Sequence, residues 1–126
     1  MANRILIAED EEAHRSLLER ILKQAGFDPT FAENGLEATK FLEQKPFDAV
    51  ILDWNMPKMD GGQVASWIRT NPKLRRLPIL MLTVRRLPEQ EVMGFESGAD
   101  DFLTKPYMPK ELIARIERLL NIGKNQ

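Results

Sequence analysis

Short apolar runs alternate with longer amphipathic segments along the chain, and this pattern predicts alternating strands and helices. The runs hold only four or five residues, and the clearest are apolar throughout, as in strands covered on both faces. The longer segments place apolar residues three or four positions apart, which is helical spacing. Strands are predicted at Ile5–Ala8, Asp28–Ala32, Ala49–Leu52, Ile79–Leu82 and Asp101–Thr104, and helices at Glu11–Ala25, Gly35–Gln44, Gly62–Asn71, Pro88–Ser97 and from Pro109 to about Leu120.

Five strand–helix units in succession predict a single α/β domain, with a parallel sheet and helices on both of its faces. Right-handed crossovers leave few topologies for such a sheet. The 126 residues suit one domain, since a domain typically holds about 150 residues. No repeat, low-complexity tract or interdomain linker interrupts the pattern. We therefore expect one domain over residues 1–121 and a polar, fraying tail over residues 122–126.

The composition excludes several kinds of site. The chain has no Cys, which excludes disulfides, thiolate zinc sites and thiol nucleophiles. Its single histidine, His14, excludes multi-histidine metal sites. We interpret His14 as a surface or flanking residue of the first helix, away from the strand ends. A content of 43% hydrophobic and 29% charged residues is typical of a soluble globular chain.

Charge and hydropathy narrow the setting. The formal net charge of -1 argues against bulk electrostatic binding of nucleic acid. The basic residues Lys73, Arg75 and Arg76 follow a helix end without interleaved aromatics, so a solvated loop is the simpler interpretation. No run approaches the roughly 20 apolar residues that span a bilayer, and the N-terminal run is too short for a signal peptide. We expect a cytoplasmic protein that binds neither nucleic acid nor membrane directly.

Charged and hydroxyl side chains directly follow four of the predicted strands. In an open α/β sheet, ligands bind at the carboxyl ends of the strands, and these ends share one edge of the sheet. Side chains distant in sequence should therefore converge there. They are Glu9 and Asp10 after the first strand, Asp53 after the third, Thr83 after the fourth and Lys105 after the fifth.

The chemistry of this set points to a cation and a phosphoryl group. Three neighbouring carboxylates repel one another, so at least one pKa should rise unless a cation lies among them. Ligands that are all oxygen suit a hard ion such as Mg²⁺, with Ca²⁺ as an alternative. A carboxylate such as Asp53 can also act as a nucleophile and form an aspartyl phosphate. Phosphoryl transfer depends mainly on positioning and charge neutralisation, which a cation, Lys105 and Thr83 would provide.

Each of these residues also has an ordinary structural interpretation. Asp10 alone would be a helix N-cap or a solvated acid, Thr83 a strand residue and Lys105 a surface lysine. Their joint placement after four different strands makes coincidence a poor explanation.

The same segments resemble the receiver domains of response regulators over roughly residues 4–120. The resemblance is carried by Glu9-Asp10 after Arg4–Ala8, by Asp53-Trp54-Asn55-Met56-Pro57-Lys58-Met59-Asp60-Gly61, by Thr83 after Pro78–Leu82, and by Lys105-Pro106.

This resemblance implies a fold and a function. The fold is a doubly wound, flavodoxin-like (βα)5 domain with strand order 2-1-3-4-5. The function is a phosphorylation-dependent signalling switch in a two-component system, and not that of a conventional enzyme, although slow hydrolysis of its own phosphate is expected. A histidine kinase or phosphotransfer protein supplies the phosphoryl group. The phosphate then alters the surface of the fourth helix, fifth strand and fifth helix, which controls a partner protein or output domain.

The resemblance also implies residue roles. Asp53 is the phosphorylation site, and the cofactor is Mg²⁺, with Mn²⁺ or Ca²⁺ as alternatives. The peptide bond between Lys105 and Pro106 is expected to be cis. The implied metal ligands are Glu9, Asp10, Asp53 and the backbone carbonyl of Asn55, and the implied phosphate-binding and switch residues are Thr83, Lys105 and the aromatic Phe102.

Three positions depart from the usual family pattern. The residue after Thr83 is usually small in this family. In this chain it is Val84, which is expected to narrow access to the phosphate. Arg85 follows it, either as a solvated loop residue or as a side chain that reaches the phosphate or tunes partner choice. Glu9 replaces the commoner aspartate and keeps the charge.

Two other functions stay open at this point. One is a Mg²⁺-dependent phosphatase with an aspartate nucleophile, although such an enzyme typically has a second acid where Asn55 stands. The other is a degenerate receiver that acts only as a protein-binding module, although all the site residues are present. A flavin or nucleotide protein would need a phosphate cradle where Glu9-Asp10 stand. We expect a monomer or a phosphorylation-dependent dimer, and no output domain within this chain.

Overall fold

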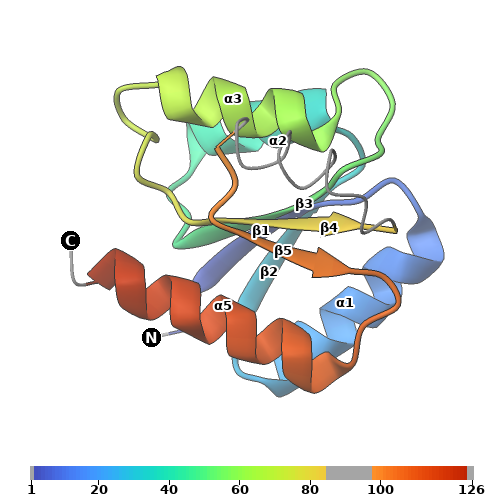
Figure 1. Ribbon diagram of the computed structural model, residues 1–126. Coiled ribbons are helices and arrows are strands. Elements are labelled where there is room, and N and C mark those ends of the chain that lie inside the picture. The colour runs from blue at the N-terminus through green and yellow to red at the C-terminus, as the bar shows by residue number, and fades with distance from the viewer. Residues whose placement is uncertain (1, 85–97, 125–126) are drawn as a thin grey trace.

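The computed structural model describes residues 2–84 and 98–124, and this part of the chain forms a five-stranded parallel sheet with four helices (Figure 1). The strand order is β2-β1-β3-β4-β5, which confirms the predicted doubly wound topology. The helix predicted at Pro88–Ser97 lies outside the described residues, as does Arg85. The elements are β1 Arg4–Ala8, α1 Glu12–Gln24, β2 Asp28–Ala32, α2 Gly35–Gln44, β3 Ala49–Asp53, α3 Gly61–Thr70, β4 Ile79–Thr83, β5 Asp101–Thr104 and α5 Pro109–Lys124.

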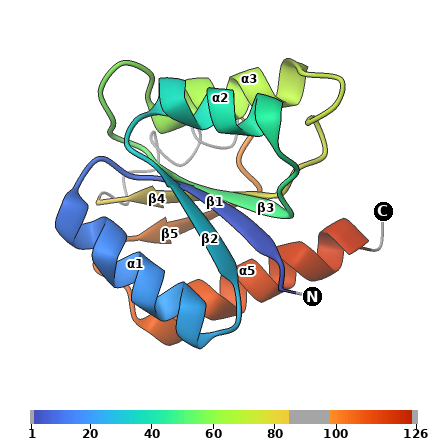
Figure 2. The same cartoon turned by 180° about the vertical axis from the view of Figure 1, so that it is seen from behind.

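The sheet separates two apolar cores because successive side chains of a strand point to opposite faces. In β1, Ile5 and Ile7 enter one core while Leu6 and Ala8 enter the other. The helices α1 and α5 cover the first face, and α2 and α3 cover the second (Figures 1 and 2). Both faces of the central strands are therefore buried, which explains why their sequences are apolar without alternation.

The strand ends differ slightly from the prediction, and the difference matters for the site. Asp53 is the last residue of β3, and Thr83 is the last residue of β4, so the two polar residues belong to the strands. Their backbones continue the parallel ladder, and both residues are consequently buried. At the other end of the chain, α5 continues to Lys124, past the expected end near Leu120. Helix propagation adds one hydrogen bond per residue, so it does not need further apolar positions.

A local sequence signal marks the start of α3, and the two edge strands carry features of their own. Asp60 and Gln63 form a capping box at the start of α3, each side chain accepting from the other's backbone amide. Pro29 lies in β2, which is an edge strand and tolerates the missing amide donor. At the opposite edge, the buried carboxylate of Asp101 pairs with Arg115 at 2.8 Å and Arg118 at 2.7 Å, tying β5 to α5. In the described ranges, no helix is long and apolar enough to cross a membrane.

Candidate functional site

The site lies at the carboxyl edge of the sheet, and the strand register brings its acids together. Strands β1 and β3 pair in parallel with Ile7 opposite Ile51 and Ala8 opposite Leu52. One step further along this register places Glu9 beside Asp53. Both residues continue the side-chain alternation toward the face covered by α1 and α5. Two acids that are distant in sequence are thereby buried next to each other, at 0% and 5% exposure.

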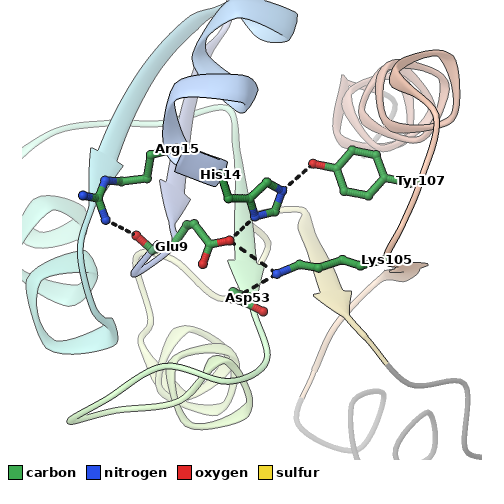
Figure 3. A network of polar contacts seen from close by, with 6 residues as sticks. All are labelled: Glu9, His14, Arg15, Asp53, Lys105 and Tyr107. Atoms are coloured by element: carbon green, nitrogen blue, oxygen red, sulfur yellow. Dashed lines mark hydrogen bonds and ion pairs between the residues drawn. The ribbon is translucent and has the colours of Figure 1, made fainter. Parts of the chain in front are cut away.

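Lys105 completes the centre from the loop after β5. Its Nζ lies 3.1 Å from Asp53 Oδ2 and 3.3 Å from Glu9 Oε1, so one ammonium contacts both buried carboxylates (Figure 3). The backbone amide of Lys105 donates to the carbonyl of Thr83 at 2.6 Å, which anchors this loop to the end of β4. The Lys105–Pro106 peptide bond is cis. The lysine is thus held at the site by backbone contacts as well as by charge.

The surroundings shift the pKa values of the three carboxyl groups in different directions. Burial, contact with Glu9 and the charge of Glu9 raise the pKa of Asp53 to about 7, against the opposing effect of Lys105. Burial alone would raise the pKa of Glu9, but hydrogen bonds and the charges of Lys105 and His14 hold it well below its usual range. Partial burial and the neighbouring Glu9 raise the pKa of Asp10. This is the response expected of crowded carboxylates when one lysine supplies the only nearby ammonium in the described site.

The same atoms fit a divalent cation. Glu9, Asp10 and Asp53 each offer a carboxylate oxygen, and these oxygens lie within 4.8 Å of one another. Glu9 Oε2 is buried and receives no hydrogen bond from any described residue. An orphaned buried carboxylate oxygen is costly, and a cation would satisfy it. An all-oxygen set that is partly open to solvent on the side of Asp10 suits Mg²⁺, which keeps several waters.

His14 corrects the sequence interpretation. It was expected to lie away from the strand ends, but its Nδ1 contacts Glu9 Oε1, and its side chain is only 14% exposed (Figure 3). Its Nε2 lies 2.7 Å from the hydroxyl of Tyr107, a residue of the loop between β5 and α5. The error arose because helical spacing alone does not say how α1 lies across the sheet. Glu9 continues the alternation of Ile5 and Ile7, whose side chains point to the face that α1 covers. This alternation was the signal in the sequence that could have placed His14 near Glu9.

Arg15 also reaches the site from α1. Its Nη1 donates to the backbone carbonyl of Glu9 at 2.9 Å, beyond the end of β1. The backbone amide of Glu9 donates to the carbonyl of Ala32 at 3.0 Å. The segment that carries the first acid is therefore fixed on both sides. Neither Arg15 nor Tyr107 was singled out from the sequence.

Comparison with known proteins agrees with this geometry. The sequence model of the response regulator receiver domain matches residues 5–117. This chain belongs to the response regulator receiver domain family. Receiver domains are signalling domains of two-component systems and not conventional enzymes, and a histidine kinase is their usual upstream partner. Their acidic pocket binds Mg²⁺, and the corresponding acids in this chain are Glu9, Asp10 and Asp53.

Relatives of this receiver domain differ in their wider architecture. It is 41% identical over 120 residues to the phosphate regulon transcriptional regulatory protein PhoB of Escherichia coli strain K12, covering 95% of this chain and 52% of PhoB. The chain therefore spans about half the length of the curated relatives it matches. It also matches the signal receiver domain of a signal transduction histidine kinase from Syntrophus aciditrophicus, with a TM-score of 0.93, 38% identity and coverage of 99% and 95% of the two chains.

A third relative bears on the metal. The receiver domain of a sensor histidine kinase from Pseudomonas aeruginosa PAO1 is described with a magnesium ion coordinated in its active site cleft. The match has a TM-score of 0.90 and 28% identity, and it covers 96% of this chain and 99% of that chain.

The remaining predicted residues surround the centre of the receiver domain. Asn55 is exposed in the bend that follows β3, and Thr83 is buried at the end of β4. Val84 follows it and is 56% exposed. Phe102 is half-buried in β5, where its ring lies 6.3 Å from that of Trp54, between centroids. Phe102 therefore packs against the residue next to Asp53, on the face that α2 and α3 cover.

Proposed function

We propose that this receiver domain is a phosphorylation-dependent switch in which Asp53 accepts a phosphoryl group from a phosphohistidine. The observation that supports this most directly is the contact of Lys105 with both Asp53 and Glu9 in a buried acidic centre. The donor is a histidine kinase or a phosphotransfer protein. The functional unit is residues 1–121, in a cytoplasmic setting.

The chemical step needs an ionised, oriented Asp53. A carboxylate oxygen attacks the phosphorus, the P–N bond breaks, and its electron pair goes to the departing imidazole, which takes up a proton. Because the pKa of metal-free Asp53 is raised to about 7, cation binding and Lys105 keep the nucleophile in its charged form. In the reverse half of the cycle, a water oxygen attacks the phosphorus, the P–O bond to Asp53 breaks, and inorganic phosphate leaves.

The bound cation would supply charge neutralisation for the acids and the phosphoryl oxygens. Its ligands are Glu9, Asp10, Asp53 and the backbone carbonyl of Asn55. Lys105 then exchanges its contact with Asp53 for a phosphoryl oxygen, and the hydroxyl of Thr83 donates to another. Mn²⁺ is a second cation of suitable size and geometry.

The output is a change in the surface formed by α4, β5 and α5, where α4 is the helix predicted at Pro88–Ser97. Lys105 lies in the loop between β5 and α5, and Phe102 lies in β5. A rearrangement of Lys105 on phosphorylation would therefore act directly on elements of this surface. Phe102 is the switch aromatic in this proposal. The partner is another protein or an output domain, and the receiver itself contacts no nucleic acid.

The test is phosphorylation followed by intact mass measurement. With Mg²⁺ and either acetyl phosphate or a cognate kinase, the protein should gain the mass of one phosphoryl group, and Asp53→Asn should gain none. Asp48→Asn is the matched control, because Asp48 is an exposed acid before β3 whose neutralisation leaves the site intact. Absence of any adduct with an active kinase and with acetyl phosphate would overturn the proposal.

A further inference from the structure

The side chain of Glu9 is held by one oxygen only. Its Oε1 contacts both His14 Nδ1 and Lys105 Nζ, the second at 3.3 Å. Its Oε2 is buried and receives no hydrogen bond from the described residues. The two oxygens of one carboxylate are therefore distinguished by their surroundings, and only Oε2 is available for another partner.

The proton positions on His14 follow from its neighbours. An ionised carboxylate only accepts hydrogen bonds, so His14 Nδ1 carries the proton that is donated to Glu9. His14 Nε2 lies 2.7 Å from the hydroxyl of Tyr107: it accepts from this hydroxyl when the imidazole is neutral and donates to it when the imidazole is protonated. Tyr107 keeps its hydroxyl proton, because burial and the charges of Glu9 and Asp53 raise the pKa of Tyr107 above the ordinary value. Both ring nitrogens of His14 and Glu9 Oε1 are thus paired, and Glu9 Oε2 is not.

The two partners of Glu9 Oε1 behave differently during the proposed phosphorylation cycle. Lys105 is shared with Asp53 and, in the proposed function, moves to the phosphoryl group. Within the part of the chain that the structure describes, the hydrogen bonds of His14 go to Glu9 and Tyr107. It is therefore the contact that keeps Oε1 occupied when Lys105 leaves.

We propose that His14, held by Tyr107, is a positioning residue that limits Glu9 to one metal-facing oxygen and thereby selects a small six-coordinate cation such as Mg²⁺ over Ca²⁺. This inference rests on the proposed function, since it concerns the same metal site. Mg²⁺ requires near-octahedral geometry with single oxygens, whereas Ca²⁺ takes six to eight oxygens and readily accepts a carboxylate through both. Partners of metal ligands commonly control affinity by orienting the ligand.

The experiment measures Mg²⁺ and Ca²⁺ binding separately by calorimetry, at one pH, for the wild type and three variants. His14→Ala should weaken Mg²⁺ binding about 10-fold while leaving Ca²⁺ binding within about two-fold, because the freed Oε1 becomes available to the larger ion. His14→Asn should restore the wild-type ratio, since its amide N–H can take the place of Nδ1–H. Tyr107→Phe should shift the ratio in the same direction as His14→Ala, by a smaller factor.

The controls separate positioning from stability. Ser16→Ala, an exposed change on the same helix, should leave both affinities unaltered. Circular dichroism establishes that each variant is folded, and Tyr107→Phe, which removes a single hydroxyl, carries the test if His14→Ala unfolds. A ratio of Mg²⁺ to Ca²⁺ affinity that is unchanged in folded variants would overturn this inference alone. A wild-type protein that binds neither ion would overturn the proposed metal site, and this inference with it.

Discussion

The ammonium of Lys105 lies 3.1 Å from the carboxylate of Asp53 and joins the end of β3 to the loop that follows β5. Both groups are largely withdrawn from solvent, with side-chain exposures of 16% and 7%, so the pair is weakly screened. The contact lowers the pKa of Asp53 against the stronger effects of burial and Glu9, which raise it. Lys105 therefore increases the fraction of Asp53 that is ionised at a given pH.

Replacing Lys105 by Met tests this role. Without the ammonium, the pKa of Asp53 in the metal-free protein should rise above its value of about 7, by roughly one unit. The chemical shift of the Asp53 carboxyl carbon, followed against pH, measures this directly. Lys73→Met removes the same charge from an exposed loop position and should leave the titration unaltered. A titration midpoint that stays constant or falls in Lys105→Met would contradict the assignment.

The raised pKa of Asp53 also predicts a stability effect. The folded protein holds this proton up to about pH 7, whereas an unfolded aspartate loses it near pH 4. The unfolded state therefore binds fewer protons between these values, and this group lowers the free energy of unfolding as the pH rises through that window. Asp53→Asn cannot ionise. In the absence of metal, it should be more stable than wild type by on the order of 4 kcal/mol at about pH 8, and nearly equal at about pH 4.

Urea unfolding in the presence of a chelator measures this difference at the two pH values. Added Mg²⁺ should stabilise the wild type and have a smaller effect on Asp53→Asn, because one ligand is lost. If the wild type were the more stable protein at the higher pH without metal, the repulsion among the carboxylates would not control stability.

Much of this site followed from one regularity of the sequence. Buried parallel strands are continuously apolar, so the first polar residue after each run marks the carboxyl edge of the sheet. Asp53 and Thr83 could be placed together from that regularity, whereas the placement of Lys105 depended on the predicted short strand Asp101–Thr104. The pairing of Asp101 with Arg115 and Arg118 could not, because it depends on how α5 is rotated against β5. His14 was misplaced for the same reason, since its position depends on how α1 crosses the sheet.

Gly61 makes the loop after Asp53 sensitive to a single methyl group. A Cβ at this position would lie 2.5 Å from the backbone oxygen of Asp53 and 2.8 Å from Met81 Sδ. Gly61→Ala should therefore push α3 away from the end of β3, which costs about 1–3 kcal/mol of stability. It should also weaken Mg²⁺ binding, because the backbone that carries Asp53 moves. Denaturant unfolding and calorimetry measure the two effects.

Gly26 provides the comparison for this variant. It has a φ of +88°, but an added Cβ there meets nothing within 4 Å. Gly26→Ala should lose about 1 kcal/mol through backbone strain alone and should bind Mg²⁺ as the wild type does. Equal Mg²⁺ affinity in the two variants would show that Gly61 affects stability without influencing the site.

Val84 offers a test of access to the phosphate. It directly follows the buried Thr83 at the end of β4, and this residue is 56% exposed. Val84→Ala should open the approach to Asp53, so acetyl phosphate should react about 2- to 10-fold faster, a barrier change of up to about 1.4 kcal/mol. Val84→Thr keeps the shape of the side chain and should react at the wild-type rate. Tryptophan fluorescence of Trp54, next to Asp53, can follow the reaction in time. A rate that rises in Val84→Thr but not in Val84→Ala would mean that polarity at this position, and not its bulk, limits the small donor.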